Sequence, residues 1–193
     1  MRMKPDRMNA FTDGVFAVII TLMVLELRTP ETAELQAIRP WLPLFGVYLL
    51  SFVNIGIFWN NHHHMMQAAR TVDGKVLWAN LGLLFWLSLV PLVIRWIDQT
   101  GMKPLPVAAY GLVLMMAGAA YQLLELALAA AEGPESTVAQ AVGGRTKEWL
   151  SVVCYLAGIG LAWVSPLISI ALYLLVSASW LVPDRRFEKR LKP

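Results

Sequence analysis

Four long stretches of the chain contain no Asp, Glu, Lys or Arg, and this feature limits the possible folds more than any other. They cover residues 40–61, 76–94, 104–124 and 149–183, which are 22, 19, 21 and 35 residues long. Roughly 20 apolar residues are enough for one α-helix to cross a bilayer. The first three stretches therefore predict one crossing each. The fourth predicts two short helices with a turn near Ser165-Pro166, because proline disfavours helix at the residue before it.

The composition supports a membrane protein over a soluble one. Of the 193 residues, 58% are hydrophobic and 15% are charged, whereas soluble domains have roughly 45–50% apolar and roughly 25% charged residues. The single cysteine, Cys154, excludes an intrachain disulfide and a cysteine-based zinc site. We therefore expect an all-α membrane protein, with residues 1–193 forming one domain.

The N-terminal apolar segment is shorter than the others. Residues 14–25 lie between Asp13 and Glu26 and number only 12. One interpretation is a signal peptide, but Asp13 interrupts it and no small-x-small cleavage site follows Leu27. We favour a helix over residues 8–29 that its neighbours shield from lipid, because intramembrane acids normally face a bundle interior or a water-filled path.

Six helices are thus predicted, and their basic flanks predict the orientation. With an even number of crossings, both termini lie on the same side of the membrane. That side then holds 12 of the 16 Lys and Arg residues. Basic residues accumulate on the cytoplasmic side of membrane proteins, so we expect cytoplasmic termini. Because these residues flank the helices instead of forming one patch, no nucleic-acid partner is expected. The predicted helices cover residues 8–29, 40–64, 75–97, 104–126, 147–164 and 166–183.

Two charged residues stand out in the first helix. Arg7 and Asp13 are six residues apart, about 240° around a helix, so they cannot pair on one face. Each needs a partner on another helix, or else stays hydrated.

The same helix has an apolar stripe. Val18, Leu22 and Leu25 recur with steps of four and three residues, and Thr21 lies at the edge of the stripe. The spacing alone favours a packing seam. The other interpretation is a pore wall, in which apolar rings gate by dewetting and hydroxyl rings ligate partly dehydrated cations.

Several segments resemble a known family. Residues 7–13, RMNAFTD, resemble the R-x-x-x-F-S-D signature of the transmembrane protein 175 potassium channel family in its prokaryotic form. Residues 14–22 resemble the rest of that family's first helix. Residues 58–63, FWNNHH, resemble its W-x-x-H-H element, and residues 78–81 and 89–91 resemble parts of its third helix. The last three predicted helices agree with the family only in number and length.

The resemblance implies a homotetramer of six-helix subunits whose first helix lines a central K+-selective pore without a T-V-G-Y-G carbonyl filter. It implies a constriction at Val18, Leu22 and Leu25, and a pore-lining hydroxyl at Thr21. This chain has Thr12 in place of the motif serine, and Val18 where the family usually has a larger side chain. The resemblance also implies a motif and inter-helix network of Arg7, Phe11, Thr12, Asp13, Trp59, His62, His63 and Asn80.

We therefore predict a potassium-selective channel, and not an enzyme, in the cell (inner) membrane of a prokaryote. Its expected partners are lipid, other copies of the chain and permeating K+, with no cofactor or bound metal. A proton- or ion-coupled secondary transporter that uses Asp13 and His62–His64 is an alternative. A membrane metallo-enzyme with these histidines as ligands is a third hypothesis, which the divergence of about 100° between adjacent helical residues disfavours.

Overall fold

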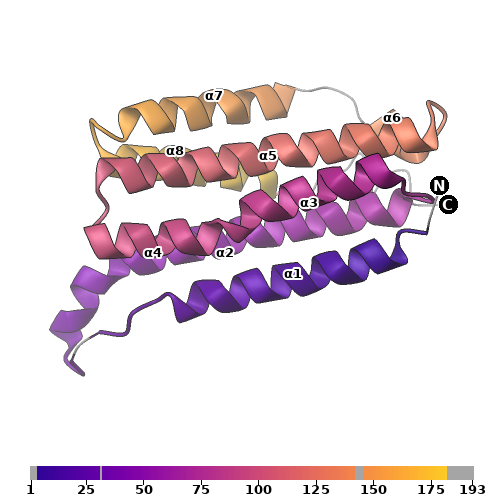
Figure 1. Ribbon diagram of the computed structural model, residues 1–193. Helices are drawn as coiled ribbons and strands as arrows, with labels where there is room; N and C mark the ends of the chain where they lie inside the picture. The colour runs from indigo at the N-terminus through magenta and orange to yellow at the C-terminus, as the bar shows by residue number, and fades with distance from the viewer. Residues whose placement is uncertain (1–3, 31, 142–145, 182–193) are drawn as a thin grey trace.

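The computed structural model describes residues 4–30, 32–141 and 146–181, which form a bundle of helices lying side by side (Figure 1). Within these described residues, four segments are long and apolar enough to cross a membrane: α1, α2, the continuous α3–α4 segment and α5. The helices α7 and α8 are shorter, with 16 residues each. The described helices are α1 (Asp6–Leu25), α2 (Leu35–Ala68), α3 (Gly74–Ser88), α4 (Val90–Thr100), α5 (Pro104–Glu132), α6 (Thr137–Ala141), α7 (Thr146–Leu161) and α8 (Pro166–Leu181).

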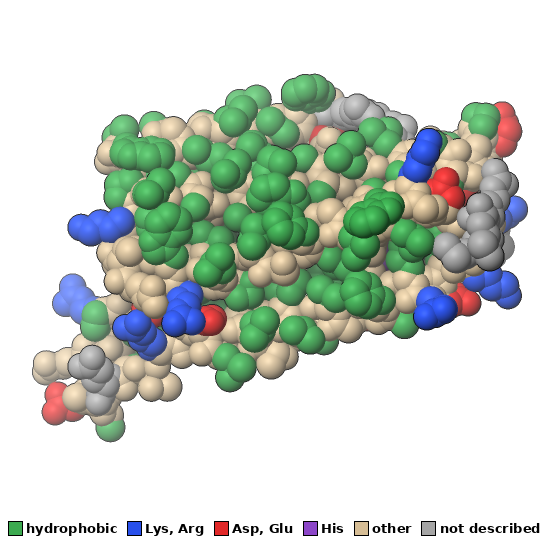
Figure 2. All heavy atoms as spheres, in the orientation of Figure 1, with side chains coloured by type: hydrophobic (Ala, Val, Ile, Leu, Met, Phe, Trp, Pro, Cys, Tyr) green, Lys and Arg blue, Asp and Glu red, His purple; other side chains and the backbone are tan. Residues whose placement is uncertain are grey.

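Helix α5 lies at the centre of the bundle and α1 at its edge. α5 packs against α3, α4, α7 and α8, whereas α1 packs against α2, α3 and α4. In Figure 1, α1 runs along the bottom of the bundle and α7 along the top. The visible face in Figure 2 has hydrophobic side chains over its middle and most Lys and Arg toward its two ends. This distribution is expected of a protein whose middle lies in lipid and whose ends contact water.

Two glycines allow α8 to approach α5 and α7 closely. Tyr173 of α8 is fully buried. A Cβ atom added at Gly111 of α5 would lie 2.1 Å from Tyr173 Oη, and one at Gly158 of α7 would lie 2.4 Å from Tyr173 Cε1. Small residues at helix contacts in membranes allow this kind of approach. Ser169 Oγ also donates a hydrogen bond of 2.6 Å to the Gly158 carbonyl, which joins α8 to α7.

The helix expected over residues 75–97 is instead two helices that meet at Leu89. Pro91 is the physical reason, because its ring has no N–H to donate and clashes with the carbonyl four residues earlier. At the break, the Leu89 N–H bonds to the Trp86 carbonyl at 3.2 Å and Ser88 Oγ donates to the Phe85 carbonyl at 2.8 Å.

Other helix boundaries also differ from the sequence prediction. The first helix ends at Leu25 rather than at residue 29. Pro30 follows it, and proline does not continue a helix because it has no N–H to donate. α2 begins before residue 40 and includes Pro40 and Pro43 within its first turns. A turn over residues 162–165 separates α7 from α8. The predicted end of the last helix, at residue 183, falls outside the described residues.

Candidate functional site

The stripe on α1 is exposed in the protomer. Val18, Leu22 and Leu25 are 57%, 45% and 72% exposed. A different face of the helix packs on the bundle, so the stripe is not a packing seam within one protomer. It must be covered by lipid, by other copies of the chain, or by the water of a pore. The buried face consists of Met8, Thr12, Phe16, Ile19 and Met23.

Thr21 lies on the exposed side of α1, near the stripe. Its Oγ1 donates a hydrogen bond of 2.9 Å to the Ala17 carbonyl in the preceding turn. Since the hydroxyl proton is used within the helix, the oxygen presents lone pairs and no proton to an approaching cation.

A buried hydrogen-bond chain joins the first three helices. Asn80 of α3 donates through Nδ2 to Thr12 Oγ1 at 2.8 Å. Asn80 Oδ1 lies 3.0 Å from His62 Nε2 of α2, and as the acceptor it requires the proton to be on that nitrogen. The three residues are at most 2% exposed. A satisfied polar network in a low-dielectric interior fixes the positions of the helices that form it.

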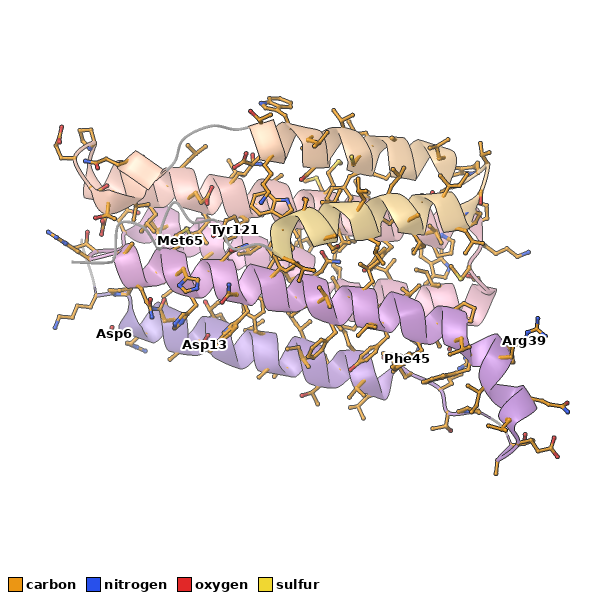
Figure 3. The ribbon with its side chains drawn as sticks, turned by 180° about the vertical axis from the view of Figure 1, so that it is seen from behind. Asp6, Asp13, Arg39, Phe45, Met65 and Tyr121 are labelled. Carbon is orange, nitrogen blue, oxygen red and sulfur yellow. The ribbon has the colours of Figure 1, made fainter. Side chains whose placement is uncertain are left out.

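Asp13 belongs to a second, separate set of contacts. Trp59 Nε1 of α2 donates to Asp13 Oδ1 at 2.9 Å, and the Trp59 ring stacks on the His63 ring with a centroid distance of 5.6 Å. His63 Nε2 in turn lies 2.9 Å from Nε2 of Gln67. Figure 3 shows Asp13 on α1, alongside α2. Adjacent residues on a helix point about 100° apart, which explains why Thr12 is bonded to α3 and Asp13 to α2.

Arg7 and Phe11 lie outside both sets. Both side chains are exposed, and they line a groove between α1 and α3 together with Leu77 and Leu81. Among the described residues, Arg7 has no hydrogen-bond or ion-pair partner. The structure therefore divides the predicted network into two clusters and leaves the motif arginine open to solvent or to another molecule.

The three consecutive histidines have different surroundings. His62 is buried, His63 is exposed and His64 is half-buried. Within the described residues, no three His, Cys, Asp or Glu side chains come close enough together to hold one metal ion.

At the other end of α1, two ion pairs that sequence reasoning missed tie the chain to α4. Arg28 Nε lies 3.0 Å from Asp98 Oδ2, and Arg95 Nε lies 3.6 Å from Glu26 Oε2. Trp41 Nε1 of α2 also donates to the Arg28 carbonyl at 2.7 Å. The signal available in the sequence was one acid and one base at the end of each of two apolar helices.

At the opposite end of the bundle, the carboxylate of Glu132 is hydrogen-bonded to the connection between α2 and α3. Glu132, the last residue of α5, accepts hydrogen bonds through Oε1 from the backbone N–H groups of Arg70 and Thr71, the latter at 2.9 Å. It thereby fixes the α2–α3 connection against α5.

Comparisons with known proteins identify the family. The model of the family "Endosomal/lysosomal potassium channel TMEM175" matches residues 7–91, which include α1 from its second residue and all of α2 and α3. A protein of Chryseobacterium sp. (strain P1-3) named a potassium channel is 46% identical over 190 residues, covering 98% of this chain and 99% of that protein. The chain belongs to the TMEM175 family. Residues of both hydrogen-bonded clusters lie within the segment that matches the TMEM175 model.

A second relative and a solved structure are also similar to this chain. A protein of Streptomyces collinus named a potassium channel is 31% identical over 126 residues, covering 61% of each chain. The crystal structure of a TMEM175 homologue from Chamaesiphon minutus, described as a lysosomal potassium-selective channel homologue, superposes with a TM-score of 0.74 at 21% identity and covers 93% of this chain and 97% of that one. This shows that the fold is shared. The relatives are named as ion channels and not as enzymes.

Proposed function

We propose that the protein is a potassium-selective channel in which four copies of α1 surround a central pore. The observation that carries the proposal is the exposed stripe of Val18, Leu22 and Leu25 on a helix whose other face is packed. The names of the Chryseobacterium and Streptomyces relatives support K+ as the permeating ion.

In this channel each stripe residue forms an apolar ring, and the rings narrow the path to a constriction. An apolar constriction blocks ions when it dewets and passes them when it widens enough to hydrate. K+ holds its hydration water less tightly than Na+, so partial dehydration at such a ring favours K+. Thr21 supplies hydroxyl oxygens beside the constriction, and no carbonyl filter loop is required.

The two hydrogen-bonded clusters position the inner half of α1 in this proposal. Thr12 is bonded through Asn80 to His62, and Asp13 is bonded to Trp59. Loss of either cluster would allow α1 to rotate and would turn the stripe away from the axis.

We also propose six crossings per subunit, with cytoplasmic termini in a prokaryotic cell membrane. α7 and α8 would form a hairpin of short crossings, since 16 residues span about 24 Å against a hydrocarbon thickness of about 30 Å. The excess of basic residues on the side of the termini supports this orientation.

The test is ion flux in liposomes with K+ or Na+ gradients. Leu22→Asn replaces an apolar ring by a hydrated one and is expected to raise resting flux and lower the preference for K+. The matched control is Leu123→Asn, because Leu123 is also exposed, at 62%, but lies on α5. Absence of cation flux in the wild type would refute the channel, and equal behaviour of the two variants would refute the assignment of the pore to α1.

The same vesicles separate a channel from a coupled transporter. A transporter that uses Asp13 and the histidines would show flux that saturates with ion concentration and requires a proton gradient. A channel shows flux that follows the K+ gradient without one.

A further inference from the structure

The exposed face of α1 continues beyond Val18 toward the start of the helix. Phe11 lies seven residues before Val18, which is about 20° short of two full turns and about 10 Å along the helix axis. Its side chain is 55% exposed, nearly the same as the 57% of Val18. Phe11 therefore shares the face of the stripe, whereas its neighbours Met8 and Thr12 are buried.

Between Phe11 and Val18 the same face has no large side chain. The intervening turn presents Gly14 and Val15, of which Val15 is half-buried and packs against the core. A Cβ atom added at Gly14 would meet nothing within 4 Å in the protomer. The wall of the helix therefore recedes at this level, with a large apolar side chain on either side of the recess.

We infer that the path has a second apolar ring, formed by Phe11 from each copy, and a glycine-walled chamber between this ring and Val18. The inference rests on the proposed arrangement of α1 around a pore. Phe11 is then a pore-lining residue that controls the entry of ions from the inner end. At the level of Gly14 no side chain projects into the path, which leaves room for water between two apolar rings.

The charged side chains near Phe11 have a net positive charge. Lys4 and Arg7 line the same groove as Phe11, with Asp6 as the acid beside them. Arg7 is four residues before Phe11 and shares its face. A cation that reaches the ring from this end therefore passes a net positive entrance.

Two substitutions test the ring and the chamber by K+ flux in liposomes. Phe11→Ser removes the apolar ring, and we expect a several-fold rise in flux. Gly14→Leu places a large side chain in the chamber, at a position where the added Cβ meets nothing within 4 Å in the protomer, and we expect a several-fold fall. Trp149→Ser is the matched control, because Trp149 is an aromatic residue of α7 that is 66% exposed and distant from α1; its flux should equal that of the wild type.

A chemical test on assembled protein avoids any effect on folding. In a Cys154→Ala background, Phe11→Cys is treated with a bulky thiol reagent, with Trp149→Cys as the control. Block of flux only in the Phe11→Cys protein supports the ring. The inference is overturned if modification at position 11 leaves flux unchanged while Leu22→Asn still alters it; an inactive wild type would instead refute the channel itself.

Discussion

Replacement of Gly111 by alanine tests how α8 is held in the bundle. The added Cβ would lie 2.1 Å from Oη, 2.3 Å from Cζ and 2.8 Å from Cε1 of Tyr173, whereas carbon atoms in contact are about 3.5–4.0 Å apart. Tyr173 cannot easily move aside, because its ring packs between those of Tyr110 and Tyr155 at centroid distances of 6.0 and 5.7 Å. Overpacking of this kind costs about 1–3 kcal/mol.

The expected result is a lower Tm. For a chain of this size, 1 kcal/mol corresponds to about 2–4 °C, so Gly111→Ala should lower the Tm of the detergent-solubilised protein by roughly 2–12 °C. The change can be followed by near-ultraviolet circular dichroism during heating, which also reports the environment of the tyrosines.

Gly118→Ala is the control on the same helix. A Cβ atom at Gly118 meets nothing within 4 Å, and alanine is favoured over glycine in a helix by about 1 kcal/mol. Its Tm should equal or exceed that of the wild type. If Gly111→Ala and Gly118→Ala had the same Tm, the proposed close packing of Tyr173 on α5 would be wrong.

Two further predictions concern the contacts of α1. Asn80→Leu leaves Thr12 and His62 without their buried partner and should cost about 1–3 kcal/mol for each group, measured as a fall in Tm; an unchanged Tm would contradict the network. Arg28→Asp should place two acids together at Asp98, and the double exchange with Asp98→Arg should restore stability. Since Arg28 is 68% exposed, a double-mutant cycle should give a coupling of only about 0.2–1 kcal/mol.

The positions of the long helices could be predicted from the sequence because a crossing helix requires a long uncharged segment. The same criterion could not find the break at Leu89, since the uncharged stretch runs through it without interruption. Pro91 was the relevant signal, and it acts through a clash with the preceding turn and not through hydropathy. Nor could it place the start of α2, which begins at Leu35, before the uncharged part, and includes Arg39.

The stripe on α1 could also be predicted, because residues three and four apart share a helix face whatever the rest of the fold does. The sequence could not predict that Thr12 is bonded to α3 and Asp13 to α2, because this depends on where α2 and α3 pass α1. The contact of Tyr173 with Gly111 joins residues that are far apart in the chain, and no local pattern marks either of them.

The break at Leu89 lies between the two places where α1 is attached to the α3–α4 segment. α1 is bonded near its start to Asn80 of α3, and just beyond its end Glu26 and Arg28 pair with Arg95 and Asp98 of α4. The two attachments thus stand on opposite sides of a joint in the backbone. Any bending at that joint changes the distance and angle between them, so α1 has to tilt with the bend or release one of its ends.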